Sequence, residues 1–250
     1  MNLTYITFRF AVCIYTLIIA YLSYDIYKMT KGGTTPWKYF AFANIVGFLW
    51  AITTLLFLDI LKNLFLLYII QPVLLLILIY FIIKVTYSFP KSYMVKIPKW
   101  FNEKILFSFI GLILILLTGY NLYLGSSLRI LSTLIGFVVG LCFVLFGFSF
   151  YFVSKYQKNL GWRFLVIYGI LLGLAMVFRN LLSSCCGITP DLIMCQKLYP
   201  PPEKFFPSLV CSQGLLSLYS FGDLLAVISS LFMIGIYLIW KHIRKSFRIE

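Results

Sequence analysis

Residues Ile130–Val153 read ILSTLIGFVVGLCFVLFGFSFYFV and contain no charged side chain. An α-helix rises about 1.5 Å per residue, so about 20 apolar residues are enough to cross the hydrocarbon core of a bilayer. The stretch lacks the strict alternation of apolar and polar residues that a strand of a membrane barrel needs. It therefore predicts a transmembrane helix.

Six similar stretches fill most of the rest of this chain of 250 residues. Composition agrees, because 62% of the residues are hydrophobic and only 11% are charged, against about 25% charged residues in ordinary soluble domains. The spans that we expect are Ile6–Tyr24, Tyr39–Leu58, Leu64–Ile83, Ile105–Leu124, Ile130–Val153, Phe164–Leu182 and Leu215–Trp240. The predicted fold class is an all-α, polytopic integral membrane protein, a bundle of seven transmembrane helices that forms a single domain over residues 1–250.

Lysine and arginine are distributed unevenly between the two sides of these spans. Of the 21 basic residues, 15 lie in the first, third and fifth connections and in the C-terminal tail, and six lie elsewhere. Basic connections stay on the cytoplasmic side, which predicts an N-terminus outside, a cytoplasmic C-terminus and a multi-pass protein of the cell membrane. The net charge of +14 then needs no nucleic acid, because a basic cytoplasmic face lies against anionic lipid headgroups.

The third connection, Tyr87–Trp100, combines lysines with aromatic residues and contains Pro90 and Pro98. Aromatic rings are enriched at membrane–water interfaces. We therefore expect a loop that lies in the interface, with Phe89 and Tyr93 among its anchors.

Glycines recur at helical spacings in two of the spans. Gly136 and Gly140 form one G-x-x-x-G pair, with Gly147 seven residues further on, and Gly169 and Gly173 form another. Such pairs let helix backbones approach closely in a membrane. The sequence therefore predicts a compact bundle.

Four of the six cysteines lie in the last outer connection, and they are Cys185, Cys186, Cys195 and Cys211. Disulfides persist on the oxidising side of a membrane, so we expect two of them, with Cys185 and Cys186 each joined to Cys195 or Cys211. With the prolines of the segment they would make residues 183–213 a stiff extracytoplasmic cap. A structural cap is favoured over a redox site because no C-x-x-C is present. Cys13 and Cys142, alone within spans, are interpreted as packing residues.

Few polar residues occur within the spans, and these are candidates for a functional site. Asp223 shares one face of the last span with four other residues, namely Ser217, Ser220, Val227 and Ser230, and we expect this face to point into the bundle. Arg179 and Asn180 lie near the outer end of the sixth span, where Arg179 is the natural ion-pair partner of Asp223. The pair is either structural or part of an outward-opening polar pocket.

Gln71 precedes Pro72 near the middle of the third predicted span. Proline removes a backbone donor, so we expect a kink there. Asn44 is expected at a comparable depth. A polar side chain at a broken helix is typical of transport sites, although a kink that only shapes the packing is the simpler interpretation.

Several kinds of chemistry are excluded. The only histidine is His242, in the basic tail, so paired-histidine haem sites, histidine-rich zinc sites and histidine-dependent nucleophilic catalysis are absent. The last span contains no lysine for a retinal Schiff base. Asp25 and Asp223 are expected on opposite sides of the membrane, too far apart for an aspartyl protease pair. No cofactor and no metal site is predicted.

The sequence thus favours a non-enzymatic membrane protein that acts as an assembly subunit or sensor-like interaction module, with other membrane subunits as partners. The alternative is a channel or transporter with a polar site around Gln71, Asn44 and Asp223. A membrane-embedded lipid-modifying enzyme is a third possibility, but the usual paired acidic clusters are missing. Transport requires a polar path that reaches Gln71, whereas assembly requires a closed core and an exposed helix face.

Overall fold

The structure is a computed structural model, and it describes residues 3–30, 34–61, 64–99, 102–123, 128–186 and 224–247. Every regular element in these ranges is helical. The elements are α1 (Leu3–Met29), α2 (Thr35–Thr54), the π-helix η1 (Leu55–Ile60), α3 (Leu64–Ser92), α4 (Glu103–Tyr123), α5 (Leu128–Tyr156), α6 (Leu160–Cys186) and α9 (Ile234–Phe247). Residues 224–232 are also helical.

Within the described ranges, six segments are long and apolar enough to cross a membrane, which identifies a multi-pass helical membrane protein. They are Phe10–Met29, Thr35–Phe57, Ile69–Ser92, Leu134–Tyr156, Leu160–Phe178 and Leu224–Ser246. Each overlaps one of the predicted spans. The fourth predicted span coincides with α4, which is not among the six. The count of seven spans therefore stays a prediction.

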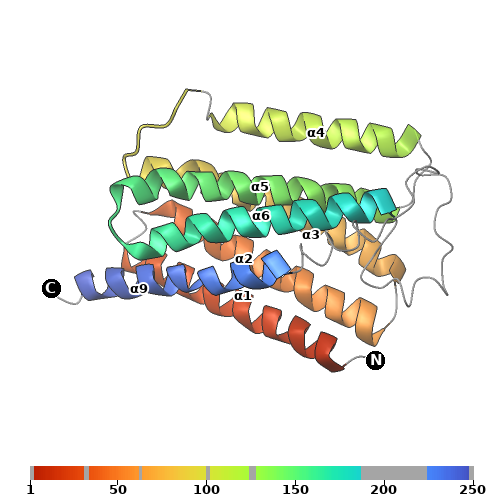
Figure 1. Cartoon of the computed structure of the whole chain (residues 1–250), viewed down its shortest axis with the longest axis horizontal. Helices are drawn as coiled ribbons and strands as arrows, with labels where there is room; N and C mark the ends of the chain where they lie inside the picture. Colours follow the sequence, from red (N-terminus) through yellow and green to blue (C-terminus); the bar gives the residue numbers. More distant parts are fainter. Residues whose placement is uncertain are drawn as a thin grey trace.

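Six of the passes form a closed ring. α1 packs on α2, α2 on α3, α3 on α5, α5 on α6 and α6 on α9, and α9 returns to α1. α4 lies outside this ring, beside α3 and α5, and Figure 1 shows it running along one flank of the bundle. Among the described helices, α4 therefore packs only on α3 and α5.

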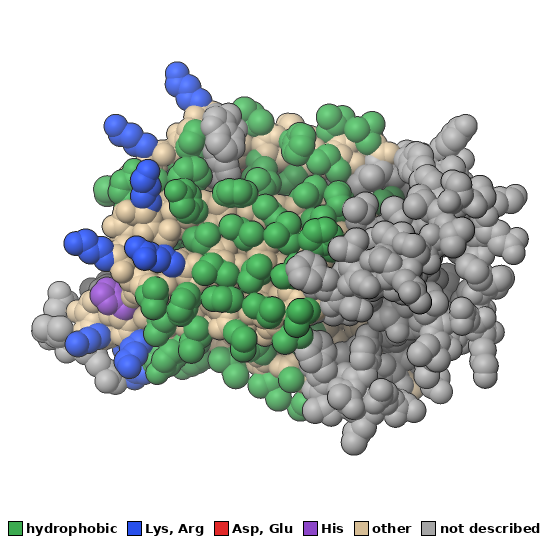
Figure 2. All heavy atoms as spheres, in the orientation of Figure 1, with side chains coloured by type: hydrophobic (Ala, Val, Ile, Leu, Met, Phe, Trp, Pro, Cys, Tyr) green, Lys and Arg blue, Asp and Glu red, His purple; other side chains and the backbone are tan. Residues whose placement is uncertain are grey.

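Basic side chains gather at one end of the bundle. α1, α3, α5 and α9 carry Lys28, Lys91, Lys155 and Lys245 in their last turns. Figure 2 shows Lys and Arg side chains at this end, where the C-terminus of Figure 1 lies. We call it the basic end.

The glycines of α5 and α6 form the tightest helix contact. A Cβ added to Gly173 would lie 2.6 Å from the Val144 amide nitrogen and 2.7 Å from the Gly140 carbonyl oxygen. A Cβ on Gly169 would lie 2.7 Å from the Cα of Gly147. Only hydrogen fits in these positions, so the predicted close approach of helices at the glycine pairs is confirmed.

A second glycine contact was not predicted. A Cβ on Gly161 would lie 2.5 Å from the Gly235 carbonyl oxygen, and one on Gly235 would lie 2.6 Å from the Gly161 carbonyl oxygen. These residues join the start of α6 to the start of α9. Gly161 lies eight residues before Gly169, and Gly235 is the only glycine of α9, so no G-x-x-x-G pattern marks the contact.

α3 is longer than expected, and this corrects the predicted loop. The helix continues past Ile83 to Ser92, so the first part of Tyr87–Trp100 is helical. Phe89 is 0% exposed and belongs to the core, so it does not anchor the chain in the membrane interface. Hydropathy suggested an early end because Lys84 and Thr86 interrupt the apolar run, whereas in the structure Lys84 pairs with Glu103 of α4 and Thr86 is buried within the bundle.

The end of α3 is a Schellman motif. The Met94 amide donates to the Lys91 carbonyl at 3.0 Å, and the Val95 amide donates to the Pro90 carbonyl at 2.8 Å. Met94 has a φ of 55°, the left-handed conformation that glycine usually supplies at this position. Its side chain is 96% exposed and has little packing to lose.

Replacing Met94 with glycine is therefore expected to stabilise the protein by about 0.5–1 kcal/mol, because the cost of the left-handed conformation disappears. Unfolding by SDS in mixed micelles, followed by tryptophan fluorescence, would measure the change. Met94→Ala is the control, since alanine keeps the Cβ and should bring no gain. Equal effects of the two substitutions would contradict this explanation.

The last pass, Leu224–Ser246, is interrupted at Met233, although a continuous span was expected. The Met233 amide bonds to the Ser230 carbonyl at 3.2 Å, and the Ile236 amide bonds to the Met233 carbonyl at 2.9 Å. Val227 is 46% exposed while Ser229 is buried. The predicted polar face therefore does not point into the bundle at Val227, because the buried face of this helix contains Ser229.

Candidate functional site

A cluster of aromatic side chains fills the middle of the ring at the basic end. We call it the aromatic cluster, and its members are Trp37 of α2, Phe89 of α3, Phe146 and Phe150 of α5, and Trp162 of α6. Ring centroids lie 4.9 Å apart for Trp37 and Phe89, and 4.6 Å apart for Phe89 and Phe150. These aromatic side chains come from four helices of the closed bundle and fill its interior at this end.

Two polar groups are buried near this cluster without a satisfied hydrogen bond. The Trp37 indole N–H and the Thr86 hydroxyl make none within the described residues. Burial raises the pKa of the Tyr93 phenol to about 12. The Tyr93 ring packs on Trp162, with 4.9 Å between the ring centroids.

The amides of Gln71 and Asn44 lie at different levels. Gln71 Nε2 donates to Thr54 Oγ1 at 3.0 Å, whereas Asn44 Nδ2 donates to the Phe40 carbonyl of its own helix at 2.8 Å. Thr54 lies about 15 Å along α2 from Asn44 at 1.5 Å per residue. The expected comparable depth is therefore wrong, and the two amides do not share one site.

The predicted position of Gln71 within its helix is also corrected. Because α3 extends from Leu64 to Ser92, Gln71 lies in its first third, toward the end opposite the basic end. α3 continues as a helix through Pro72, so the kink there stays a prediction, and an irregular turn lies in α2, where η1 begins directly after Thr54. A π-helix often marks a functional position, so the Gln71–Thr54 bridge is a candidate site.

The strength of this bridge can be measured. Changing Gln71 to leucine and Thr54 to valine, singly and together, is expected to give a coupling energy of about 0.6 kcal/mol, as for other hydrogen bonds between membrane helices. Thr53 supplies the control, because its hydroxyl bonds only to carbonyls of its own helix. A cycle of Gln71→Leu with Thr53→Val should be additive. Coupling in both cycles would contradict a direct bridge.

Asn180 is the one member of the predicted Arg179 region whose side chain is described. It packs directly on Gly136 of α5, whose added Cβ would lie 2.6 Å from Asn180 Oδ1. Asn180 Nδ2 also donates to the Met176 carbonyl at 2.8 Å. Its role in the structure is therefore to join α5 and α6, next to the glycine contact.

Other predicted site residues lie outside the described part of the chain. This applies to Asp223, Cys195 and Cys211, and to the side chains of Arg179, Cys185 and Cys186. The Asp223–Arg179 pair and the two disulfides therefore stay predictions. Cys13 and Cys142 are buried and free, which confirms their interpretation as packing residues.

Two hydrogen bonds join α1 to the last pass. The Tyr15 hydroxyl donates to the Ser230 carbonyl, near the interruption at Met233. Trp240 Nε1 donates to Asp25 Oδ2 at 2.7 Å near the basic end. Both bonds join residues 215 positions apart, so α1 and the last pass run parallel in a single register. Sequence patterns gave no sign of either bond.

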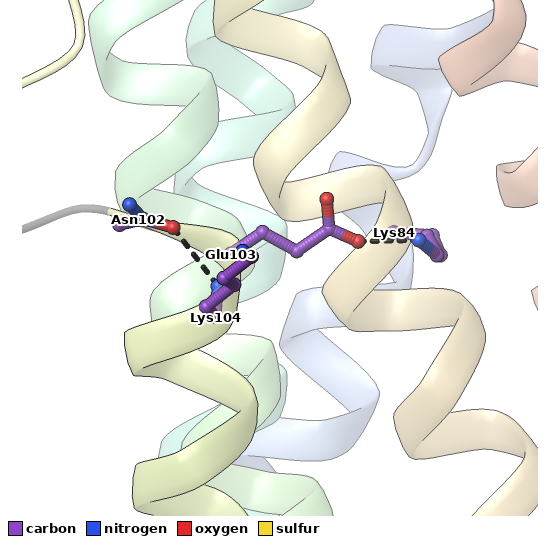
Figure 3. Close-up of polar contacts among 4 residues, drawn as sticks. All are labelled: Lys84, Asn102, Glu103 and Lys104. Carbon is purple, nitrogen blue, oxygen red and sulfur yellow. Dashed lines mark hydrogen bonds and ion pairs between the residues drawn. The ribbon is translucent and has the colours of Figure 1, made fainter.

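The ion pair of the described residues joins α3 to α4, and Figure 3 shows its geometry. Lys84 Nζ donates to Glu103 Oε1, and the two side chains are 27% and 25% exposed. Asn102 caps α4, since its Oδ1 accepts from the Lys104 amide at 3.0 Å. The pair therefore fixes the start of the outlying helix against α3. Sequence analysis assigned Lys84 to a loop and missed this contact.

The described residues contain no group of three histidine, cysteine or carboxylate side chains that could hold a metal ion. Polar groups that the structure places between helices thus include the Gln71–Thr54 bridge, Asn180, the two links of α1 to the last pass, and the Lys84–Glu103 pair. A comparison of the chain with protein-family models, curated proteins and solved structures found no match.

Proposed function

We propose that this protein is a non-enzymatic assembly subunit of a membrane complex, and that α4 is the helix that binds its partner. α4 stands outside the ring of six passes. The partner that fits is a transmembrane helix of another subunit. In this proposal the chain lies in the cell membrane with its N-terminus outside and its basic end in the cytoplasm.

The observation that carries the proposal is the open space beside Gly111. A Cβ added there would meet no atom within 4 Å in the described part of the chain, whereas Gly140, Gly161 and Gly173 are each pressed against a neighbouring backbone. Gly111 lies on a stripe of side chains turned away from the bundle, which we call the α4 stripe: Ile105, Ser108, Gly111, Leu112 and Ile115. Small residues within an apolar stripe allow a second helix to approach closely.

The interior supports assembly over transport. The aromatic cluster fills the middle of the ring at the basic end, and a conduit would have to pass through it. The Gln71 and Asn44 amides, which a transport site would combine, lie about 15 Å apart along the helices. Neither observation depends on the direction in which the chain is inserted.

Site-specific photo-crosslinking in native membranes tests the proposal. A photoreactive residue at Leu112 is expected to form one discrete protein adduct, whereas one at Leu17, which is 44% exposed on α1, should react with lipid. Gly111→Leu, which fills the open space, should abolish the Leu112 adduct without lowering the thermal stability of the purified protein. The proposal fails if the adduct survives Gly111→Leu or if both positions react only with lipid.

A conduit remains the second candidate, because the Gln71–Thr54 bridge lies where η1 interrupts α2. A conduit requires water both at the level of Gln71 and at the level of Asn44. Gln71→Cys and Asn44→Cys should then both react with a small hydrophilic thiol reagent above the level of the parent protein. Protection of Asn44→Cys would exclude a continuous polar path.

The proposed orientation has its own test. Lys96 is exposed beyond the end of α3, so Lys96→Cys should react with a membrane-impermeant thiol reagent only after the cells are made permeable. Labelling of intact cells would place the basic end outside and reverse the orientation.

A further inference from the structure

The face of α3 that carries Lys84 is an exposed apolar stripe. Tyr80, Ile77 and Val73 follow Lys84 at spacings of four, three and four residues toward the start of the helix, which places all four on one face. Their side chains are 46%, 41% and 53% exposed. We call these four residues the α3 stripe. It is a different surface from the α4 stripe and faces the membrane beside the ion pair.

The ammonium group of Lys84 is only partly used by the protein. An ammonium has three N–H donors, and Glu103 is its one hydrogen-bonding partner within the described residues. The rings of Tyr80 and Phe107 each have their centroid 5.8 Å from Lys84 Nζ. Since the side chain keeps 27% of its surface exposed, further acceptors from outside the protein can reach it.

The dimensions of the stripe match one leaflet of a bilayer. The distance from Lys84 to Val73 along the helix is about 16 Å, and half of a typical hydrocarbon core is about 15 Å. With Lys84 at the boundary between headgroups and acyl chains, Val73 reaches the bilayer midplane. The stripe therefore offers a cation at headgroup level followed by one leaflet's depth of apolar surface.

The charge around this position favours an anion. Lys91, Lys96, Lys99 and Lys104 are all exposed at the same end of α3 and α4, whereas Glu103 is the one acidic residue in the described connection and is already paired. A choline or ethanolamine cation would gain nothing from this surplus of positive charge, but a phosphate on an anionic headgroup would.

We propose that the α3 stripe, at the junction with α4, is a binding site for one anionic glycerophospholipid. The phosphate accepts hydrogen bonds from the free N–H groups of Lys84, and an acyl chain lies along Tyr80, Ile77 and Val73. The site does not depend on a protein partner for α4 or on the direction of insertion, because phospholipid headgroups are present at both surfaces of the bilayer.

Native mass spectrometry of protein purified from mixed phosphatidylglycerol and phosphatidylcholine tests this site. The parent protein should retain phosphatidylglycerol preferentially, and Lys84→Gln should reduce that preference about fivefold, since a basic residue near the membrane surface contributes about 1 kcal/mol to binding an anionic lipid. Lys155→Gln, at an exposed lysine of the same end, should leave it unchanged. Equal losses in the two variants would indicate general surface attraction and overturn the site.

Glu103→Gln separates lipid binding from a merely structural ion pair. If Lys84 served only to hold α4, Glu103→Gln and Lys84→Gln would change lipid retention alike. The proposal requires that Glu103→Gln, unlike Lys84→Gln, does not reduce retention, because removing the carboxylate frees the ammonium for phosphate and should maintain or increase retention. Thermal stability of Glu103→Gln should also rise on addition of phosphatidylglycerol but not of inorganic phosphate. An equal rise with inorganic phosphate would show that the group binds free anions and not a lipid.

Discussion

Gly173→Ala is expected to destabilise the folded bundle by about 3 kcal/mol, at the upper end of the usual cost of overpacking. The new methyl group would lie 2.6 Å from the Val144 amide nitrogen and 2.7 Å from the Gly140 carbonyl oxygen. Both are backbone atoms in the middle of a helix, so neither can move aside as a flexible side chain would. α5 and α6 must separate, and they lose contacts along their whole interface.

SDS-induced unfolding in mixed micelles would measure this effect. The matched control is Gly111→Ala, which makes the same chemical change on a helix where the new methyl group meets no neighbour within 4 Å in the described structure. Because alanine has a higher helix propensity than glycine, this variant should be neutral or more stable by up to about 1 kcal/mol. Similar destabilisation by both variants would show that the glycine contact is not the cause.

Phe89→Ala is expected to cost about 3 kcal/mol, the lower end of the range for removing a buried phenylalanine. Phe89 is 0% exposed and lies against Trp37, Phe150 and Trp162. Inside a membrane the loss of transfer from water contributes little, because lipid is itself apolar, but the lost packing around the cavity remains. The effect should appear as lower stability and as a changed fluorescence of the two neighbouring tryptophans.

The control for this substitution is Phe109→Ala. Phe109 is 58% exposed on α4, so its ring contacts mainly the membrane and its removal leaves no cavity in the protein. Stability should be nearly unchanged. A loss at Phe109 equal to that at Phe89 would mean that ring burial does not decide the cost.

Hydropathy was sufficient to locate the long helices because burial in lipid demands apolar length, and that requirement is local in the sequence. Hydropathy was not sufficient to predict the residue at which α3 ends. Lys84 lies inside the helix and pairs with Glu103 of α4, and a contact between distant residues leaves no trace in a local average. The end at Ser92 depends on a Schellman motif with methionine where glycine is usual, so the expected signal was absent.

The candidate site was predictable in its residue types but not in its pairings. Gln71 was singled out for the proline beside it in its own helix, whereas the irregular turn of the structure lies in α2, next to Thr54. The Gln71 amide donates to Thr54, and Asn44, expected at a comparable depth, donates within its own helix. Helical periodicity tells which residues share a face of one helix, but the depth of one helix relative to another follows from packing. Gly161 and Gly235 illustrate the same limit, since neither was part of a recognisable pair and each is significant only beside the other.

The closed ring also has a consequence for biogenesis. Most neighbours in the ring are close in the sequence, so α1 to α3 and then α5 and α6 can associate soon after each enters the membrane. Contacts between α1 and the last pass join residues 215 positions apart, at Tyr15 with Ser230 and at Asp25 with Trp240. Such distant contacts form late. During synthesis the protein is therefore expected to form an open crescent, in which the side of α1 that later packs on the last pass is still exposed. The ring closes only when the last pass leaves the translocon.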